Sequence, residues 1–239
     1  MLDKNRWQIA ATNQIPLRPI MKKRSKILFY SGFFGLLFLG FWWFLFRGTE
    51  NWKSKLPTIS YVQPFKFINQ NGDTITEKSV EGKVYVANYF FATCQGICPN
   101  MNGRVKQVYT AFKGITDVAF ISHTCQPEND SVPQLNQYTD SIGADGKQWQ
   151  FVTGNKLELY KMARESYHID DPKNNVGKIE DQFLHSQFLA LVDRSGKVRG
   201  IYDGLKETEI TKLKGDIADL LKERTNTVFV NSIYSNNPQ

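Results

Sequence analysis

Residues 83–99 read KVYVANYFFATCQGICP and place Cys94 and Cys98 directly after a continuous apolar segment. A segment that is apolar on both faces is typical of a central strand in a sheet covered by helices, so we predict a buried strand over Lys83–Phe91. Pro99 is favoured in the first turn of a helix and predicts that a helix begins at this point. The positive end of a helix lowers the pKa of a thiol. The pattern therefore predicts two reactive thiols at the start of a helix.

The segments on either side of this stretch alternate between strands and helices. Asn71-Gly72 between two alternating segments predicts a β-hairpin, because Asn-Gly supplies the positive φ angles of a tight turn. Further strands are predicted at 118–122, 149–152, 188–192 and 198–202, and further helices at 102–112, after Ser131, at 157–167 and at 207–222. This order predicts an α/β sandwich of thioredoxin type over residues 64–224, with an N-terminal hairpin extension. The polar segment 169–182 is expected to be an exposed insertion.

The basic charge of the chain is concentrated at its N-terminus. Residues 1–47 carry eight of the 30 Lys and Arg residues and one acid, which leaves 22 basic and 22 acidic residues over 48–239. The net charge of +7 therefore belongs to the tail. A neutral globular part gives no indication of nucleic acid binding.

Residues 27–46 form an uncharged apolar run. As a helix, the run spans about 30 Å, the thickness of a bilayer's hydrocarbon core. The basic cluster before it predicts that residues 1–26 stay in the cytoplasm. The predicted order is then the anchor at 27–46, a linker at 47–63, the domain at 64–224 and a polar tail at 225–239. We expect a single-pass anchor in the inner (cytoplasmic) membrane with the C-terminal domain in the periplasm.

Two alternative interpretations of the apolar run fit the sequence less well. A mitochondrial inner membrane gives the same orientation, but the short N-terminus lacks a clear transit peptide. A cleaved signal peptide usually has a shorter apolar core that ends at a small-residue site, whereas this run ends in WWFLFR.

Two thiols four positions apart lie on one face of a helical or turn-like backbone. They can close a disulfide or share a soft metal ion such as Cu(I) or Zn²⁺. Because two sulfurs are an incomplete metal site, a third ligand is expected from a histidine. His185 precedes the strand at 188–192, in a loop that lies beside the cysteine loop in a thioredoxin-like sheet. His123 ends a strand at the same edge of the sheet, and His168, beyond a helix, is a poorer candidate.

These residues resemble the Sco/SenC family. The resemblance lies in TCxxxCPxM at 93–101, in the segment 122–130 and in His185-Ser186, and it covers roughly residues 60–222. It implies a membrane-anchored thioredoxin-fold copper protein that helps to assemble the dinuclear copper centre of cytochrome c oxidase. The implied cargo is Cu(I), with Cu(II) as a second form, and the implied partner is the copper-bearing subunit of the oxidase. The implied copper ligands are Cys94, Cys98 and His185.

Two positions depart from the family pattern. Gln126 stands where the family usually has Asp, with Cys125 beside it, and Leu184 stands where an acidic residue often precedes the histidine. Cys125 can add a third thiol, join a disulfide, or be buried and inert, as free cysteines often are. Met101 carries a soft sulfur, but a methionine on a helix face usually fills a core.

Three functions fit these residues. The first is a metallochaperone that passes copper on by ligand exchange. The second is a membrane-anchored thiol–disulfide oxidoreductase, with Cys94 and Cys98 as its redox pair; a combined role would keep the oxidase subunit's cysteines reduced. The third is a structural disulfide in a tethered binding domain. An odd total of three cysteines favours a working dithiol over a plain disulfide scaffold, and we expect an assembly factor rather than an enzyme.

Overall fold

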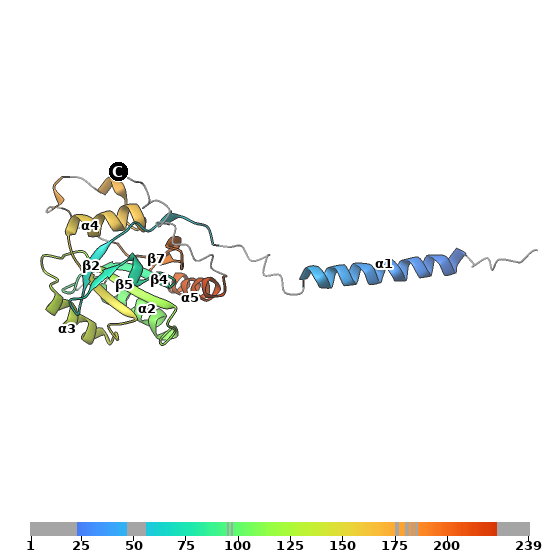
Figure 1. Ribbon diagram of the computed structural model, residues 1–239, viewed down its shortest axis with the longest axis horizontal. Coiled ribbons are helices and arrows are strands. Elements are labelled where there is room, and N and C mark those ends of the chain that lie inside the picture. The colour runs from blue at the N-terminus through green and yellow to red at the C-terminus, as the bar shows by residue number, and fades with distance from the viewer. Residues whose placement is uncertain are drawn as a thin grey trace, which may run out of the picture. The chain divides into compact units, whose positions relative to one another are not determined.

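A computed structural model describes residues 23–46, 56–94, 96, 98–174, 177–179, 182, 184 and 186–223 (Figure 1). The chain divides into two compact units, residues 1–54 and 55–239. His185 and the tail predicted at 225–239 lie outside the described residues.

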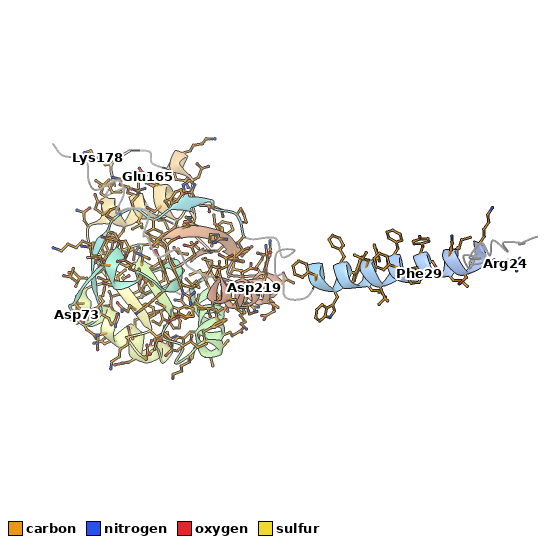
Figure 2. The ribbon with its side chains drawn as sticks, turned by 45° about the vertical axis from the view of Figure 1, so that its right-hand side comes forward. Arg24, Phe29, Asp73, Glu165, Lys178 and Asp219 are labelled. Atoms are coloured by element: carbon orange, nitrogen blue, oxygen red, sulfur yellow. The ribbon has the colours of Figure 1, made fainter. Side chains whose placement is uncertain are left out.

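The first unit contains one helix, α1 (Lys23–Phe46), among its described residues. Residues 23–44 of this helix are long and apolar enough to cross a membrane, by length and composition. Figure 2 shows side chains such as Phe29 projecting from it, and none of its described residues is buried. A helix that is apolar all round is not expected to be stable in water without a partner or a lipid environment. The predicted N-terminal apolar helix is therefore present.

The second unit is built on one eight-stranded sheet with the order β1-β8-β7-β4-β5-β6-β2-β3. The strands are β1 (Ser60–Tyr61), β2 (Lys66–Asn69), β3 (Thr74–Thr76), β4 (Val84–Phe90), β5 (Val118–Thr124), β6 (Trp149–Thr153), β7 (Phe188–Val192) and β8 (Lys197–Asp203). Strands β4, β5 and β6 are parallel, and β7 and β8 continue the sheet antiparallel beyond β4. This is the predicted thioredoxin-like arrangement.

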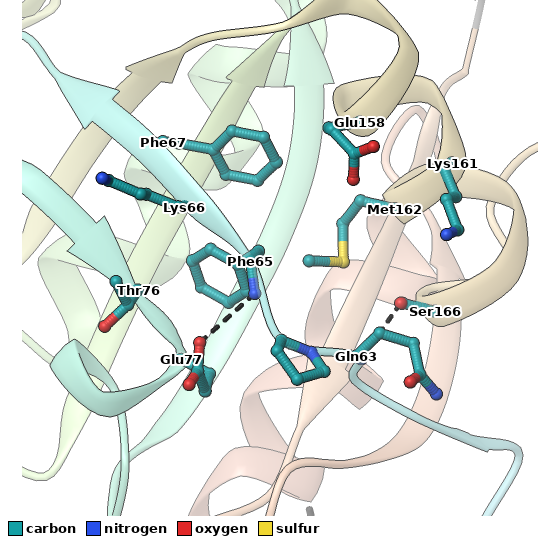
Figure 3. A pocket seen from close by; sticks show the side chains of 11 residues that line it. Gln63, Phe65, Lys66, Phe67, Thr76, Glu77, Glu158, Lys161, Met162 and Ser166 are labelled. Atoms are coloured by element: carbon teal, nitrogen blue, oxygen red, sulfur yellow. Dashed lines mark hydrogen bonds between the residues drawn. The ribbon is translucent and has the colours of Figure 1, made fainter. Parts of the chain in front are cut away.

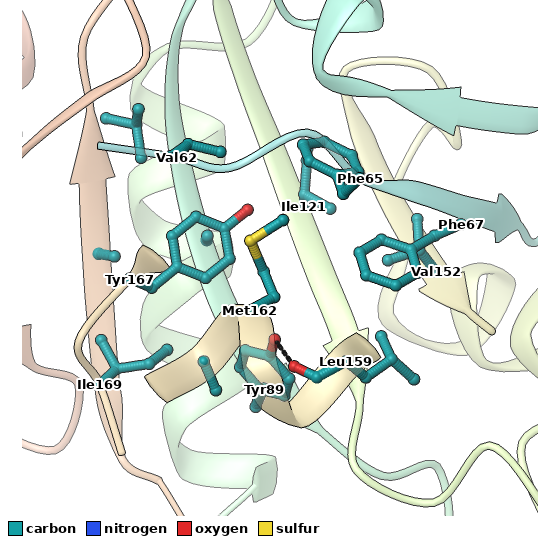
Figure 4. Packing of buried hydrophobic residues seen from close by; sticks show 14 of the residues in the cluster. Val62, Phe65, Phe67, Tyr89, Ile121, Val152, Leu159, Met162, Tyr167 and Ile169 are labelled. Carbon is teal, nitrogen blue, oxygen red and sulfur yellow. Dashed lines mark hydrogen bonds between the residues drawn. The ribbon is translucent and has the colours of Figure 1, made fainter. Parts of the chain in front are cut away.

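Helices cover both faces of the sheet (Figure 1). They are α2 (Cys98–Ala111), α3 (Val132–Ile142), α4 (Lys156–Lys161) and α5 (Glu207–Lys222), with a π-helical turn at Met162–Ser166 and 3₁₀ turns at Glu77–Ser79 and Pro172–Asn174. Successive residues of a strand point to opposite faces, so Val84 and Val86 pack with α2, α3 and α5, whereas Tyr85 and Tyr89 pack with α4 and the π-helical turn (Figure 4). Every residue of β4 and β5 is buried, which confirms the predicted central strand.

The hairpin predicted at Asn71-Gly72 is present. Asn69 N–H donates to the carbonyl of Asp73 at 2.9 Å, and Gly72 has a φ of 86° that most other residues adopt only with strain. This hairpin adds to the sheet beside β6. The sheet begins at Ser60, inside the segment expected as a linker, because Val62 is buried in the core and holds β1 against β8.

Candidate functional site

The two cysteines of the central motif lie where β4 ends and α2 begins. Cys94 N–H closes a turn by donating to the carbonyl of Phe91 at 3.2 Å, and α2 starts at Cys98 itself. Cys98 is buried and packs in the same cluster as the fully buried Met101, whereas Cys94 is half-buried. Met101 is thus a core residue, as its helix-face position predicts.

The thiols of Cys94 and Cys98 are adjacent, and their side chains are hydrogen-bonded to each other. Burial, together with the neighbouring Cys94 thiol, raises the pKa of Cys98 to about 12. The expected lowering of the thiol pKa by the helix end is therefore wrong for Cys98, because desolvation of the thiolate outweighs the helix end. A bound soft cation deprotonates a thiol outright, so this pair suits a metal better than it suits a permanently ionised nucleophile at Cys98.

Cys125 is a third thiol, which packs in the core on the other face of the sheet from Cys98. Its backbone N–H donates to the carbonyl of Phe90 at 2.7 Å, at the end of β4. Burial raises the pKa of Cys125 well above its ordinary value, and the Cys98 and Cys94 thiols raise it further. All three cysteines are in the thiol form. Of the three roles that the sequence leaves open for Cys125, its near-complete burial favours the inert one.

Asp130 connects the loops that carry Cys94 and Cys125. Both of its carboxylate oxygens accept the N–H of Ala92 at 3.3 Å, and one accepts the hydroxyl of Thr124. In the sequence, Asp130 ends the segment 122–130 that resembles the family, and no role is predicted for it. The only local signal is an acidic residue in a segment that follows a buried strand, and the partner at Ala92 is 38 positions away.

Replacing Asp130 by alanine is expected to lower the free energy of unfolding by about 2 kcal/mol, because the N–H of Ala92 and the hydroxyl of Thr124 lose a buried acceptor. Urea unfolding measures the change. Asp130→Asn is the control, because its carbonyl oxygen still accepts a hydrogen bond, and we expect it to lose less stability. Equal losses for the two variants would contradict this role of the carboxylate.

His123 lies in an aromatic core. Its ring stacks on Tyr89 with centroids 4.9 Å apart and meets the rings of Phe67 and Tyr167 edge-on at 5.5 and 5.4 Å. Its side chain points to the face of the sheet covered by α4, opposite to Cys98. Burial lowers the pKa of His123 to about 3. The structure therefore does not bring His123 to Cys98, and the suggestion that it is a ligand is not supported.

Of the other two histidines, the structure describes His168 but not His185. His168 is exposed and has a left-handed φ of 55°. His185 lies outside the described residues, so its role stays a prediction. Its chain neighbours Leu184 and Ser186 are both buried. Among the described residues, no group of three or more His, Cys, Asp or Glu side chains is arranged to hold a metal ion.

The segment 169–182 differs from the predicted exposed insertion. Ile169 and Gln182, at its two ends, are buried, and the Asp170 carboxylate pairs with the buried guanidinium of Arg164 at 2.8 Å. Only its middle is exposed, for example at Lys173. The polar composition of the segment predicts solvent contact, but Asp170 and Gln182 instead satisfy a buried arginine.

A groove of about 480 Å³ lies over the hairpin and α4, away from the cysteine motif (Figure 3). Aromatic and thioether side chains form its floor, and charged side chains of α4, β2 and the turn after β3 surround it. Its lining residues are Gln63, Pro64, Phe65, Lys66, Phe67, Thr76, Glu77, Glu158, Lys161, Met162 and Ser166. Because this lining contains neither cysteine nor histidine, the groove is not part of the thiol site.

Comparisons with known proteins agree on one family. The SCO1/SenC family model matches residues 53–222. A SCO1 protein homolog of Bacillus subtilis is 31% identical over 160 residues, which cover 65% of this chain and 80% of the relative.

Solved structures point the same way. The structure of BsSco, described as a member of the Sco family of cytochrome c oxidase assembly proteins with a disulfide switch, is 28% identical with a TM-score of 0.60, and the match covers 72% of this chain and all of that one. ScoI of Bradyrhizobium japonicum, solved with copper bound, shares the fold at 23% identity and a TM-score of 0.52, over 68% of this chain and 99% of that one.

Proposed function

Because this chain belongs to the SCO1/SenC family, we propose that it is a membrane-tethered copper protein that delivers copper to the dinuclear copper centre of cytochrome c oxidase. The observation that carries the proposal is the pair of adjacent thiols, one buried at Cys98 and one half-buried at Cys94. Soft sulfur ligands select soft metal ions such as Cu(I) and Zn²⁺ over hard cations. ScoI supports the proposal because it has the same fold and was solved with copper bound.

We propose Cys94, Cys98 and His185 as the copper ligands. Strand β7 runs antiparallel to β4, with Ala190 opposite Ala87 and Val192 opposite Tyr85. The start of β7 therefore lies beside the end of β4, where the cysteine loop leaves the sheet. We therefore expect the histidine three residues before β7 to complete a three-coordinate site with the two thiolates.

Delivery would proceed by ligand exchange. Cys94 is the more accessible of the two sulfurs, so we expect an incoming thiolate of the recipient to replace it first. The new sulfur–copper bond forms as the Cys94–copper bond breaks, and the oxidation state of the metal does not change. Cys98 and the histidine would then be replaced in turn. In this proposal α1 anchors the protein in the inner membrane, with residues 1–26 in the cytoplasm and the domain in the periplasm.

A second function uses the same two sulfurs without metal. The Cys94 thiolate would attack a disulfide of the oxidase subunit, and Cys98 would resolve the mixed disulfide, leaving the subunit reduced and this pair oxidised. The adjacency of the two thiols supports this reaction. The raised pKa of Cys98 disfavours it as the attacking group, which leaves that role to Cys94.

A two-arm transfer assay separates these functions. In one arm, the full chain in detergent is loaded with Cu(I) and mixed anaerobically with the reduced copper-binding domain of the oxidase subunit, and copper in each separated protein is measured. In the other arm, the metal-free reduced chain is mixed with the same domain in its disulfide form, and free thiols are counted. Copper transfer in the first arm is the expected result. Thiol transfer alone would favour the second function, and neither transfer would overturn both.

A further inference from the structure

The hydroxyl of Tyr160 joins three backbone segments that are far apart in sequence. It donates to the carbonyl of Cys125 at 2.9 Å, has the carbonyl of Gln182 at 3.3 Å as a second acceptor, and accepts the N–H of Leu184 at 3.1 Å. Tyr160 is fully buried. Burial raises the pKa of Tyr160 to about 12, so the proton that it donates is present at neutral pH.

These contacts link the chain around position 185 to the cysteine loop. Gln182 and Leu184 lie three positions and one position before His185. Cys125 donates its N–H to the carbonyl of Phe90, where β4 ends. The Tyr160 hydroxyl on α4 therefore connects two places. One is the backbone just before His185, and the other is Cys125, which is bonded to the end of β4.

Arg164 lies one turn further along the same helical segment. Its side chain contacts Gln182 as well, but through the Gln182 side chain. Its Nη1 donates to Oε1 of Gln182 at 2.8 Å, and its Nε donates to the carboxylate of Asp170 at 2.8 Å. The guanidinium carbon lies 5.4 Å from the centre of the Tyr160 ring. Burying two charges contributes little net stability. Their placement is better explained by the fixed position that they impose on Gln182.

The chain is also held on the other side of position 185. The hydroxyl of Ser186 donates to the carbonyl of Ile169 at 2.7 Å and accepts the N–H of Phe188 at 3.2 Å. The neighbours of position 185 are therefore bonded to α4, through Tyr160, and to the segment that follows it, through Ile169. Consecutive Cα atoms are only 3.8 Å apart, so the two bonded residues, Leu184 and Ser186, directly flank the proposed ligand.

We propose that Tyr160 and Arg164 form a clamp that positions His185 for copper coordination. The inference rests on the proposed function. It also explains a departure from the family pattern: Leu184 cannot hold the imidazole through an acidic side chain, but its backbone N–H is bonded to Tyr160. Tyr160 and Arg164 are thus positioning residues that act through the histidine, since a ligand binds well only when its backbone is held in a productive geometry.

The test measures Cu(I) affinity of the full chain in detergent by competition with a chromophoric Cu(I) chelator. Tyr160→Phe is expected to weaken binding by about 10-fold to 100-fold, the usual effect of removing a group that orients a ligand. In a His185→Ala background, the same substitution should cause no further loss. The nitrogen hyperfine signal of the Cu(II) form should weaken in Tyr160→Phe and be absent in His185→Ala.

Tyr89→Phe is the matched control. It removes a buried phenol hydroxyl that donates to the carbonyl of Leu159 at 2.5 Å in the same core. This hydroxyl bonds none of the described residues next to position 185, which are 182, 184 and 186. We expect Tyr89→Phe and Tyr160→Phe to lower the melting temperature by similar amounts and only Tyr160→Phe to weaken copper binding. Gln182→Ala, which removes the Arg164 contact, is a second test if Tyr160→Phe fails to fold, and it should also weaken binding.

The outcomes separate the clamp from the proposed function. A parent chain that binds no Cu(I), or a His185→Ala variant with the parent's affinity, would overturn the ligand set and the clamp with it. Where the parent does depend on His185, three results would overturn the clamp alone: unchanged affinity in the clamp variants, an equal loss in Tyr89→Phe, or a further loss from Tyr160→Phe in the His185→Ala background.

Discussion

Replacing Cys98 by serine is expected to weaken Cu(I) binding by roughly a thousandfold, which corresponds to about 4 kcal/mol of binding free energy. A serine hydroxyl is a hard, un-ionised oxygen at neutral pH and cannot replace a thiolate on a soft cation. Cys98 lies buried beside Cys94 at the start of α2, so no solvent ligand can readily take the vacated place. Chelator competition with the parent and the variant, both fully reduced, measures the ratio of affinities.

Cys125→Ser is the matched control for this prediction. It makes the same substitution at a buried thiol that packs with the opposite face of the sheet, and we expect its affinity to stay within about threefold of the parent's, a difference of less than 1 kcal/mol. A loss in Cys125→Ser as large as that in Cys98→Ser would show that the site uses three thiols. The three-ligand set with His185 would then be wrong.

Acidification is expected to destabilise the folded domain through His123. Its pKa is about 3 in the folded protein, against an ordinary value of 6.5, because burial among aromatic rings disfavours the charged ring. Below pH 6.5 His123 binds a proton in the unfolded chain but stays neutral in the folded protein. The free energy of unfolding therefore falls by about 1.4 kcal/mol per pH unit as the pH drops from 6.5 towards 3, about 4 to 5 kcal/mol in total.

The variant His123→Phe isolates this contribution. Phenylalanine fits among the same rings but has no titrating nitrogen, so the variant should match the parent near pH 7.5 and exceed its stability increasingly below pH 6. The titratable groups that face His123, Tyr89 and Tyr167, have pKa values raised above their ordinary value and stay neutral over this range. Asp130, whose pKa is raised by burial, contributes with the opposite sign, and its effect cancels between parent and variant. Parallel pH profiles in urea unfolding would contradict the assignment.

Much of the architecture follows from patterns within short stretches of the chain. The mainly apolar run before Cys94 predicts the central strand, Asn71-Gly72 predicts the hairpin, and the alternation of segments predicts the thioredoxin-like order. Each depends on residues a few positions apart, whose period of burial or special backbone angles are local properties. The dithiol was found in the same way, because both sulfurs lie in one motif.

The features that distinguish this site depend on contacts between distant segments. No local pattern indicates that desolvation outweighs the helix end at Cys98, that Asp130 holds Ala92, or that Tyr160 bonds Cys125 and Leu184. The sheet face on which His123 lies decides between ligand and core residue, and packing against Phe67 and Tyr167 settles it. Amino-acid order alone determines which groups are available in this chain; burial and hydrogen bonding, which exist only once the segments meet, determine their protonation and their partners.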